Sequence, residues 1–187
     1  MKIIFLVIPM LMPLISKCQG MNADYYENRK LERIHTIYPL NIGFTTLFFD
    51  YSFISYQIAY GQKVNQMDQI LFGIKYHQDI DYPSSKAYGF ELQYRFNFNK
   101  DSNVEFKSKS YWSPYFEYSN FGRNDRYFSE KTMINVGVIL VNKLQITNEI
   151  ILDLFYGLGL SSVNYNNSRF GDKYLSFKIG IQLGFAF

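Results

Sequence analysis

The last thirteen residues of the chain, Leu175 to Phe187, read LSFKIGIQLGFAF. Apolar residues occupy every second position of this stretch, and small or polar residues occupy the positions between them. Because successive side chains of a β-strand point to opposite faces, the alternation predicts a strand with one wholly apolar face. The direction in which that face points distinguishes a soluble barrel from a membrane barrel.

Seven earlier segments repeat this period of two, and helical spacing is hard to find after Ile37. In the clearest of them, Tyr88 to Phe98, aromatic and aliphatic residues alternate with Gly, Glu, Gln, Arg and Asn. The other six lie within residues 40–48, 54–61, 69–77, 111–119, 134–140 and 150–160. With the carboxy-terminal segment, the sequence predicts eight strands.

The distribution of charge indicates which face of these strands points outward. The apolar faces contain no charged residue, whereas the opposite faces carry Lys75, Glu91, Arg95, Glu117, Asp153 and Lys178. A soluble ligand-binding barrel such as a lipocalin shows the reverse, and a polar inside with an apolar outside is typical of a transmembrane barrel. Because lipid offers no partner to an open sheet edge, the barrel must close. The predicted fold class is therefore all-β, an eight-stranded antiparallel up-and-down transmembrane β-barrel.

The six inward charges comprise three basic and three acidic residues. Side chains can fill the lumen of an eight-stranded barrel, so we expect a neutral polar network of ion pairs that plugs it. The alternative is a channel, in which the same charges line a path for ions or small solutes.

The amino end resembles a secretory signal peptide. Lys2 precedes an apolar run from Ile3 to Ile15, which is too short to cross a bilayer as a helix. Ser16 and Cys18 are small residues at the −3 and −1 positions of a cleavage site before Gln19, as signal peptidase sites prefer. Cleavage after Gly20 is the alternative.

We therefore divide the chain into a signal peptide, residues 1–18, a periplasmic lead-in, residues 19–36, and an outer membrane barrel, residues 37–187. A lipoprotein signal would instead make Cys18 the acylated residue, although Lys17 stands where such signals prefer Gly or Ala. Cys18 is the one cysteine, so a mature chain without it forms neither a disulfide nor a cysteine-based metal site.

The signal and the even number of strands place both ends of the barrel in the periplasm. We then expect the connections at residues 62–68, 99–110 and 142–148 on the periplasmic side. The connections at residues 50–52, 79–86, 120–129 and 164–173 are expected outside the cell.

Three stretches carry a resemblance to a known group of proteins. They are GFELQYRFNF at Gly89 to Phe98, INVGVILVNKLQITNEIILDLFYGLGL at Ile134 to Leu160, and the terminal LGFAF. Over residues 39–187 the chain resembles the small outer membrane β-barrel proteins of Bacteroidota-type bacteria, which include a family of unknown function. The resemblance implies that the barrel assembly machinery recognises the end of the last strand.

By this resemblance, the assembly signal falls on Leu183, Phe185 and Phe187. The alternative is that Phe187 belongs to the ring of aromatic residues at the membrane surface. The two roles are compatible.

Catalysis has few candidate residues. Only His35 and His77 are histidines, and Asp79 and Asp81 follow His77 closely enough to orient its ring. A lipid-modifying enzyme of the outer membrane needs a serine and a histidine at the lipid-facing rim, whereas alternation points His77 inward. We therefore predict no catalytic, cofactor or metal site, and keep the lipid-modifying enzyme as a second alternative.

The expected function is a structural or surface-interaction role in the cell outer membrane through extracellular loops. Expected partners are outer membrane lipid and lipopolysaccharide, the barrel assembly machinery, and an extracellular ligand that the sequence does not name. The net charge of +3 is small and scattered, which argues against nucleic acid.

Overall fold

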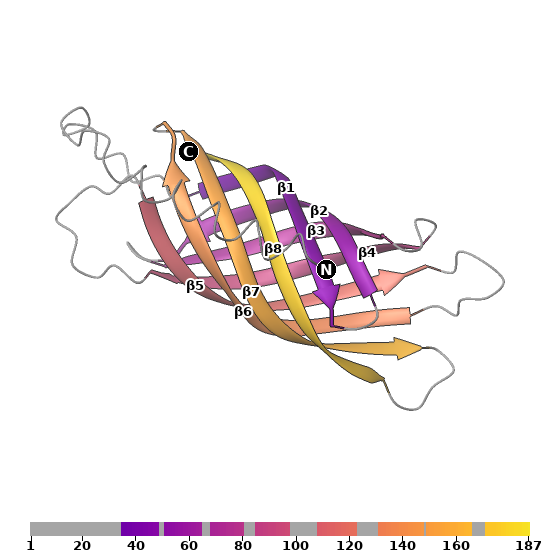
Figure 1. Cartoon of the computed structure of the whole chain (residues 1–187). Coiled ribbons are helices and arrows are strands. Elements are labelled where there is room, and N and C mark those ends of the chain that lie inside the picture. The colour runs from indigo at the N-terminus through magenta and orange to yellow at the C-terminus, as the bar shows by residue number, and fades with distance from the viewer. Residues whose placement is uncertain are drawn as a thin grey trace.

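The computed structural model describes residues 35–48, 51–64, 68–80, 85–97, 108–122, 131–147, 149–165 and 171–187. Within them the chain forms eight strands (Figure 1): β1 (His35–Leu47), β2 (Tyr51–Lys63), β3 (Gln69–Asp79), β4 (Lys86–Asn97), β5 (Ser108–Phe121), β6 (Lys131–Gln145), β7 (Ile150–Tyr165) and β8 (Asp172–Ala186). No helix in the described residues is long and apolar enough to span a membrane. The predicted signal peptide and most of the lead-in lie outside these ranges.

The strands follow one another around a closed ring, each antiparallel to its neighbours, and β1 pairs with β8 to complete it. At the end of this seam, the backbone N–H of His35 donates to the carbonyl of Phe187 at 3.2 Å, and the N–H of Phe187 donates to the carbonyl of His35 at 3.0 Å. The ring therefore leaves no unpaired strand edge to face lipid. The predicted fold class is confirmed. We call the end with His35 and Phe187 the terminal end, and the opposite end the far end.

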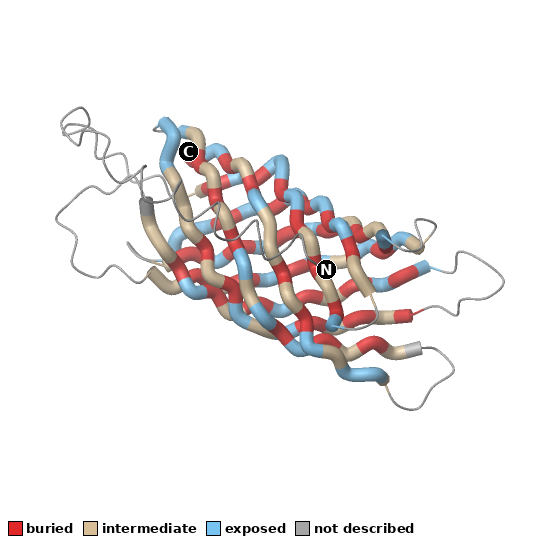
Figure 2. Tube along the Cα trace, viewed as in Figure 1, coloured by how far each residue is buried: buried red, intermediate tan, exposed pale blue. Residues whose placement is uncertain are grey.

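Side-chain exposure alternates along the strands, as the banding in Figure 2 shows. The outward Tyr88 and Ile58 are 68% and 65% exposed, whereas the inward Arg95 and Glu117 are fully buried. Apolar side chains outside and polar ones inside are the arrangement that the sequence predicts.

A bulge in β1 exchanges the inward and outward positions of this strand. Its register shifts between Tyr38 and Asn41 against β2, and between Ile37 and Leu40 against β8. Tyr38 and Asn41 therefore both point inward, while Leu40 between them is exposed. After the bulge, inward positions continue at every second residue from Asn41, and the last of them, Leu47, is buried in the interior.

Several element boundaries differ from the sequence-based ones. β1 begins at His35, so two residues of the predicted lead-in belong to the barrel. β5 begins at Ser108 and β6 continues to Gln145, which shortens two of the predicted periplasmic connections. Backbone pairing extends these strands beyond the segments in which apolar residues alternate, because a strand outside the lipid band needs no apolar face.

Apolar side chains also form part of the interior, which the sequence analysis did not predict. The far end holds one buried apolar group, formed by Leu47, Phe53, Ala87, Phe121, Met133 and Val163. Two further groups are Tyr111, Tyr115, Ile139, Val141 and Phe155, and nearer the terminal end Tyr38, Ala59 and Leu71. The interior is therefore layered, with charged and apolar zones following each other along the axis.

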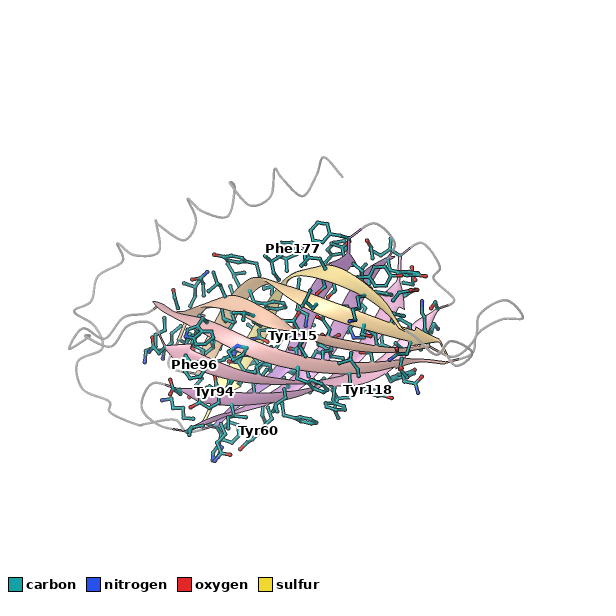
Figure 3. All side chains as sticks on the ribbon, turned by 90° about the horizontal axis from the view of Figure 1, so that it is seen from below. Tyr60, Tyr94, Phe96, Tyr115, Tyr118 and Phe177 are labelled. Atoms are coloured by element: carbon teal, nitrogen blue, oxygen red, sulfur yellow. The ribbon has the colours of Figure 1, made fainter. Side chains whose placement is uncertain are left out.

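Aromatic rings gather on the outer surface at both ends of the lipid-facing band. At the terminal end, Phe96 packs 4.4 Å from Tyr94 and 4.6 Å from Trp112, measured between ring centroids. Figure 3 shows Tyr60, Tyr94 and Phe96 towards one end of the barrel and Tyr118 towards the other. Such aromatic girdles mark the two membrane surfaces in outer membrane barrels.

Candidate functional site

Four of the six predicted inward charges meet in one buried group, which we call the central charge cluster: Lys75 (β3), Glu91 (β4), Glu117 (β5) and Lys178 (β8). Lys75 Nζ lies 2.5 Å from Glu91 Oε2 and 2.9 Å from Glu117 Oε2. Lys178 Nζ lies 2.5 Å from the same Glu117 oxygen and also pairs with Glu91. Each lysine thus contacts both carboxylates, and the cluster carries no net charge.

The ion pair between Lys178 and Glu91 crosses the lumen. β8 and β4 are four strands apart in either direction around the ring, so they face each other across the barrel. All four side chains of the central charge cluster are at most 3% exposed. Their charges are therefore compensated by one another and not by water, as buried ions require.

His77 lies beside the central charge cluster. Its Nε2 atom is 3.0 Å from Glu117 Oε1, and its ring packs edge-on against Phe53, with centroids 6.3 Å apart. The ring is fully buried inside the barrel. Asp79, which the sequence suggested as its orienting acid, is also buried, and Asp81 lies outside the described residues.

The other two predicted charges form a second group nearer the terminal end. Arg95 Nη1 donates to Asp153 Oδ2 at 2.6 Å and to the hydroxyl of Tyr38 at 3.3 Å. The amide of Gln182 donates to the same Asp153 oxygen at 2.8 Å. We call this group, Arg95 and Asp153 with their partners, the arginine cluster.

Neutral amides join these two charged groups, and the sequence analysis did not single them out. Gln93 donates to Glu91 Oε1 at 2.5 Å and accepts from Arg95 Nε at 3.1 Å, so it bridges the central charge cluster and the arginine cluster. Asn41 donates to Gln57 at 2.6 Å and to Gln182 at 2.9 Å. All four amide side chains occupy inward positions. This inward parity is the one feature of the sequence from which their place in the network could have been predicted.

The residues predicted as the assembly signal lie on the outer face of β8 at the terminal end. Phe185 and Phe187 are exposed, and Leu183 is half-buried. The ring of Phe187 lies 5.7 Å from that of His35, whose Nδ1 is 2.6 Å from the hydroxyl of Tyr60. The last residue thus packs against the first strand, where the barrel closes.

The described residues contain no group of three or more His, Cys, Asp or Glu side chains placed to hold a metal ion. The carboxylates of the central charge cluster and of the arginine cluster are instead engaged by lysine, arginine and amide groups.

Two solved structures resemble this closed ring over most of its length. Neisserial surface protein A (NspA) is 16% identical, with a TM-score of 0.56, over 82% of this chain and 97% of that chain. The fold is that of the small outer membrane β-barrels. The N-terminal β-barrel domain of Pseudomonas aeruginosa OprF is 13% identical, with a TM-score of 0.51, over 83% of this chain and 98% of that domain.

At these identities the comparison concerns the fold alone. No family profile and no curated protein sequence matches the chain. Membership of a Bacteroidota-type family therefore stays a prediction.

Proposed function

We propose that this protein is a non-conducting outer membrane barrel, whose polar lumen is plugged and whose role is to hold surface loops in the membrane. The observation that carries the proposal is the ion pair between Lys178 and Glu91, because its two residues belong to opposite strands. Lys75 and Glu117 occupy the same level, so side chains from four strands fill this part of the lumen.

The layers on either side support the same function. The far end of the interior is closed by an apolar group that includes Phe53, Phe121 and Met133. On the terminal side, the arginine cluster spans from β4 to β7. An ion on the axis would have to lose its water in an apolar layer and then break a compensated charge cluster, both of which are costly.

We expect the refolded wild-type protein to give no stepwise conductance in a planar lipid bilayer. The double variant E91A/K178A removes the pair that crosses the lumen and leaves Lys75 paired with Glu117, so its interior stays neutral. We expect this variant to stay non-conducting, because the far-end apolar layer and the arginine cluster still block the lumen, and the exposed turn variant E149Q to behave like wild type. Steady conductance by the wild-type protein would contradict the plug and favour the channel.

A scaffold role leaves binding to the connections at the far end, which are formed in part by residues 123–130 and 166–170. These segments lie outside the described residues, and loops on rigid scaffolds commonly carry function. The proposal is tested with cells that display variants in which either segment is shortened. Their adhesion to extracellular matrix and to lipopolysaccharide is compared with that of cells that display the wild-type protein. Unchanged binding by both variants would leave the barrel as a structural element of the membrane.

The position of His77 supports a role without catalysis. A fully buried imidazole inside the barrel is out of reach of a lipid substrate on the outer surface. His35 is at the terminal end, where it contacts Tyr60 and Phe187.

We propose further that Phe187 belongs to the signal by which the cell assembles the barrel. Phe187→Ala is then expected to lower, several-fold, the fraction of protein that shows heat-modifiable gel mobility in isolated outer membranes. Phe177→Ala is the matched control, because Phe177 also points outward from β8 but lies far from the chain end. Equal losses of heat-modifiable protein for the two variants would indicate that Phe187 acts only as a member of the aromatic girdle.

A further inference from the structure

A buried lysine at the far end of the interior belongs to neither charged cluster. Lys131, the first residue of β6, is only 7% exposed. Its Nζ atom lies 4.4 Å from the ring centroid of Tyr51 and 4.7 Å from that of Phe121. Both distances are within the range of about 6 Å at which the face of an aromatic ring attracts a cation. The ammonium group of Lys131 therefore contacts two aromatic rings at once.

The two rings come from different sides of the barrel wall. Phe121 is the direct cross-strand partner of Lys131 on β5. Tyr51 is the first residue of β2, which is four strands away from β6 in either direction around the ring. The side chain of Lys131 therefore crosses the lumen to reach Tyr51. It connects two opposite strands at the mouth of the far end.

Neighbouring side chains hold both rings in place. The ring of Phe53 packs against both of them, with its centroid 6.2 Å from that of Tyr51 and 5.2 Å from that of Phe121. The ring of Tyr174, on β8, packs edge-on against Tyr51 at 6.1 Å. These contacts between rings do not involve the lysine. The two aromatic faces are therefore preorganised to receive a cation, which lowers the cost of binding one.

A carboxylate adds to the attraction of the rings for a cation. Asp79 of β3 is buried, and its negative charge acts on the ammonium group of Lys131. Asp79 is also the cross-strand partner of Phe53, so it stands beside the aromatic rings. Aromatic rings recognise ammonium ligands in this way, and a nearby carboxylate adds Coulomb attraction. We call the rings of Tyr51 and Phe121, with the carboxylate of Asp79, the far-end cation site.

We propose that the far-end cation site is a binding site for an alkylammonium ion and that Lys131 is its built-in ligand. The bound ammonium group closes the mouth above the buried apolar group of the far end. A primary amine in the medium finds the site occupied, and it binds when the side chain of Lys131 is removed. The inference does not rest on the proposed function, because the site requires neither the central charge cluster nor a particular orientation in the membrane.

Chemical rescue by n-propylammonium tests the proposal on the folded full-length barrel in detergent. Lys131→Ala removes three methylene groups and an ammonium group, which are the groups that this ion supplies. We expect the variant to lose its folded gel mobility at a lower temperature than wild type, and n-propylammonium chloride to reverse this loss saturably. The ion should not change the wild-type temperature, because the site is filled. No rescue, or equal rescue by 1-propanol or by sodium chloride at the same concentration, would overturn the proposal.

A pair of double variants tests whether the aromatic rings bind the ion. Y51L/K131A lacks one of the two ring faces, so n-propylammonium should no longer raise the temperature at which its gel mobility changes. Y56L/K131A is the matched control, because Tyr56 also belongs to β2 but is exposed on the outer surface. We expect this control to be rescued as well as Lys131→Ala alone. Equal rescue of the two double variants would exclude Tyr51 from the site and overturn the proposal.

The reactivity of Lys131 in the wild-type protein keeps the proposal testable if Lys131→Ala does not fold. Acetylation by acetic anhydride, followed by mass spectrometry, compares Lys131 with Lys86 and Lys173, which are exposed lysines of the same end. We expect Lys131 to react several-fold more slowly than either. Tyr51→Leu should accelerate its reaction, and Tyr56→Leu should not. A wild-type rate equal to that of Lys86, or the same acceleration by both variants, would contradict the far-end cation site.

Discussion

Glu117→Ala is expected to lower the free energy of unfolding by about 3–5 kcal/mol, the range found when one partner of a buried ion pair is removed. Glu117 Oε2 accepts hydrogen bonds from the ammonium groups of both Lys75, at 2.9 Å, and Lys178, at 2.5 Å. The other carboxylate oxygen of Glu117 faces His77. Without it, two buried ammonium groups share the single carboxylate of Glu91. Urea unfolding in lipid vesicles, followed by the fluorescence of the one tryptophan, Trp112, measures the change.

A charge-compensated variant separates the effect of charge from that of volume. Lys75→Met removes one ammonium group, so the double variant K75M/E117A contains the neutral pair of Lys178 with Glu91. We expect the double variant to lose less stability than the sum of the two single variants. Glu149→Ala is the control for loss of an exposed acid. Additive losses, or a Glu117→Ala effect as small as that of the control, would show that the central charge cluster does not act as a unit.

Gly157→Ala is expected to destabilise the barrel by about 1–3 kcal/mol through overpacking. A Cβ atom at this position would overlap the backbone carbonyl oxygen of Val138 and lie 2.6 Å from Ile139 Cα. These atoms belong to β6, the hydrogen-bonded neighbour of β7. These backbone atoms cannot move away without disturbing the pairing of β6 with β7. The steric strain therefore cannot be relieved at a small cost in free energy.

Gly73→Ala is the matched control for this prediction. A Cβ atom at residue 73 would meet the side chain of Gln57 and not the backbone. The Gln57 side chain can rotate away at the cost of its hydrogen bond with Asn41, so the loss should be about 1 kcal/mol. The temperature at which gel mobility changes ranks the variants. A Gly73→Ala loss equal to that of Gly157→Ala would contradict the steric explanation.

The sequence analysis recovered the strands because their signal is local. Each outward position repeats after two residues, and lipid excludes charge from it, so a stretch such as Tyr88 to Phe98 identifies its faces without reference to the rest of the chain. The bulge in β1 was missed because it lies between Tyr38 and Asn41, at the start of the strand, where the alternation had not yet begun. The apolar interior groups were missed because an inward residue has no polar requirement where it packs against other apolar side chains.

Alternation and composition were sufficient for the eight strands, for their apolar outer faces and for the inward direction of the six charged residues. Closure into a ring followed from the absence of hydrogen-bond partners in lipid. The pairing of the charges depended instead on register and on the circular order of the strands. Glu91 and Lys178 are 87 positions apart in the chain, and they meet because β4 and β8 face each other at the same height across the lumen. The two-residue period predicts which face of a strand a charged residue occupies. The height of that residue along the barrel axis depends on the hydrogen-bond register of every strand between the two that carry the ion pair.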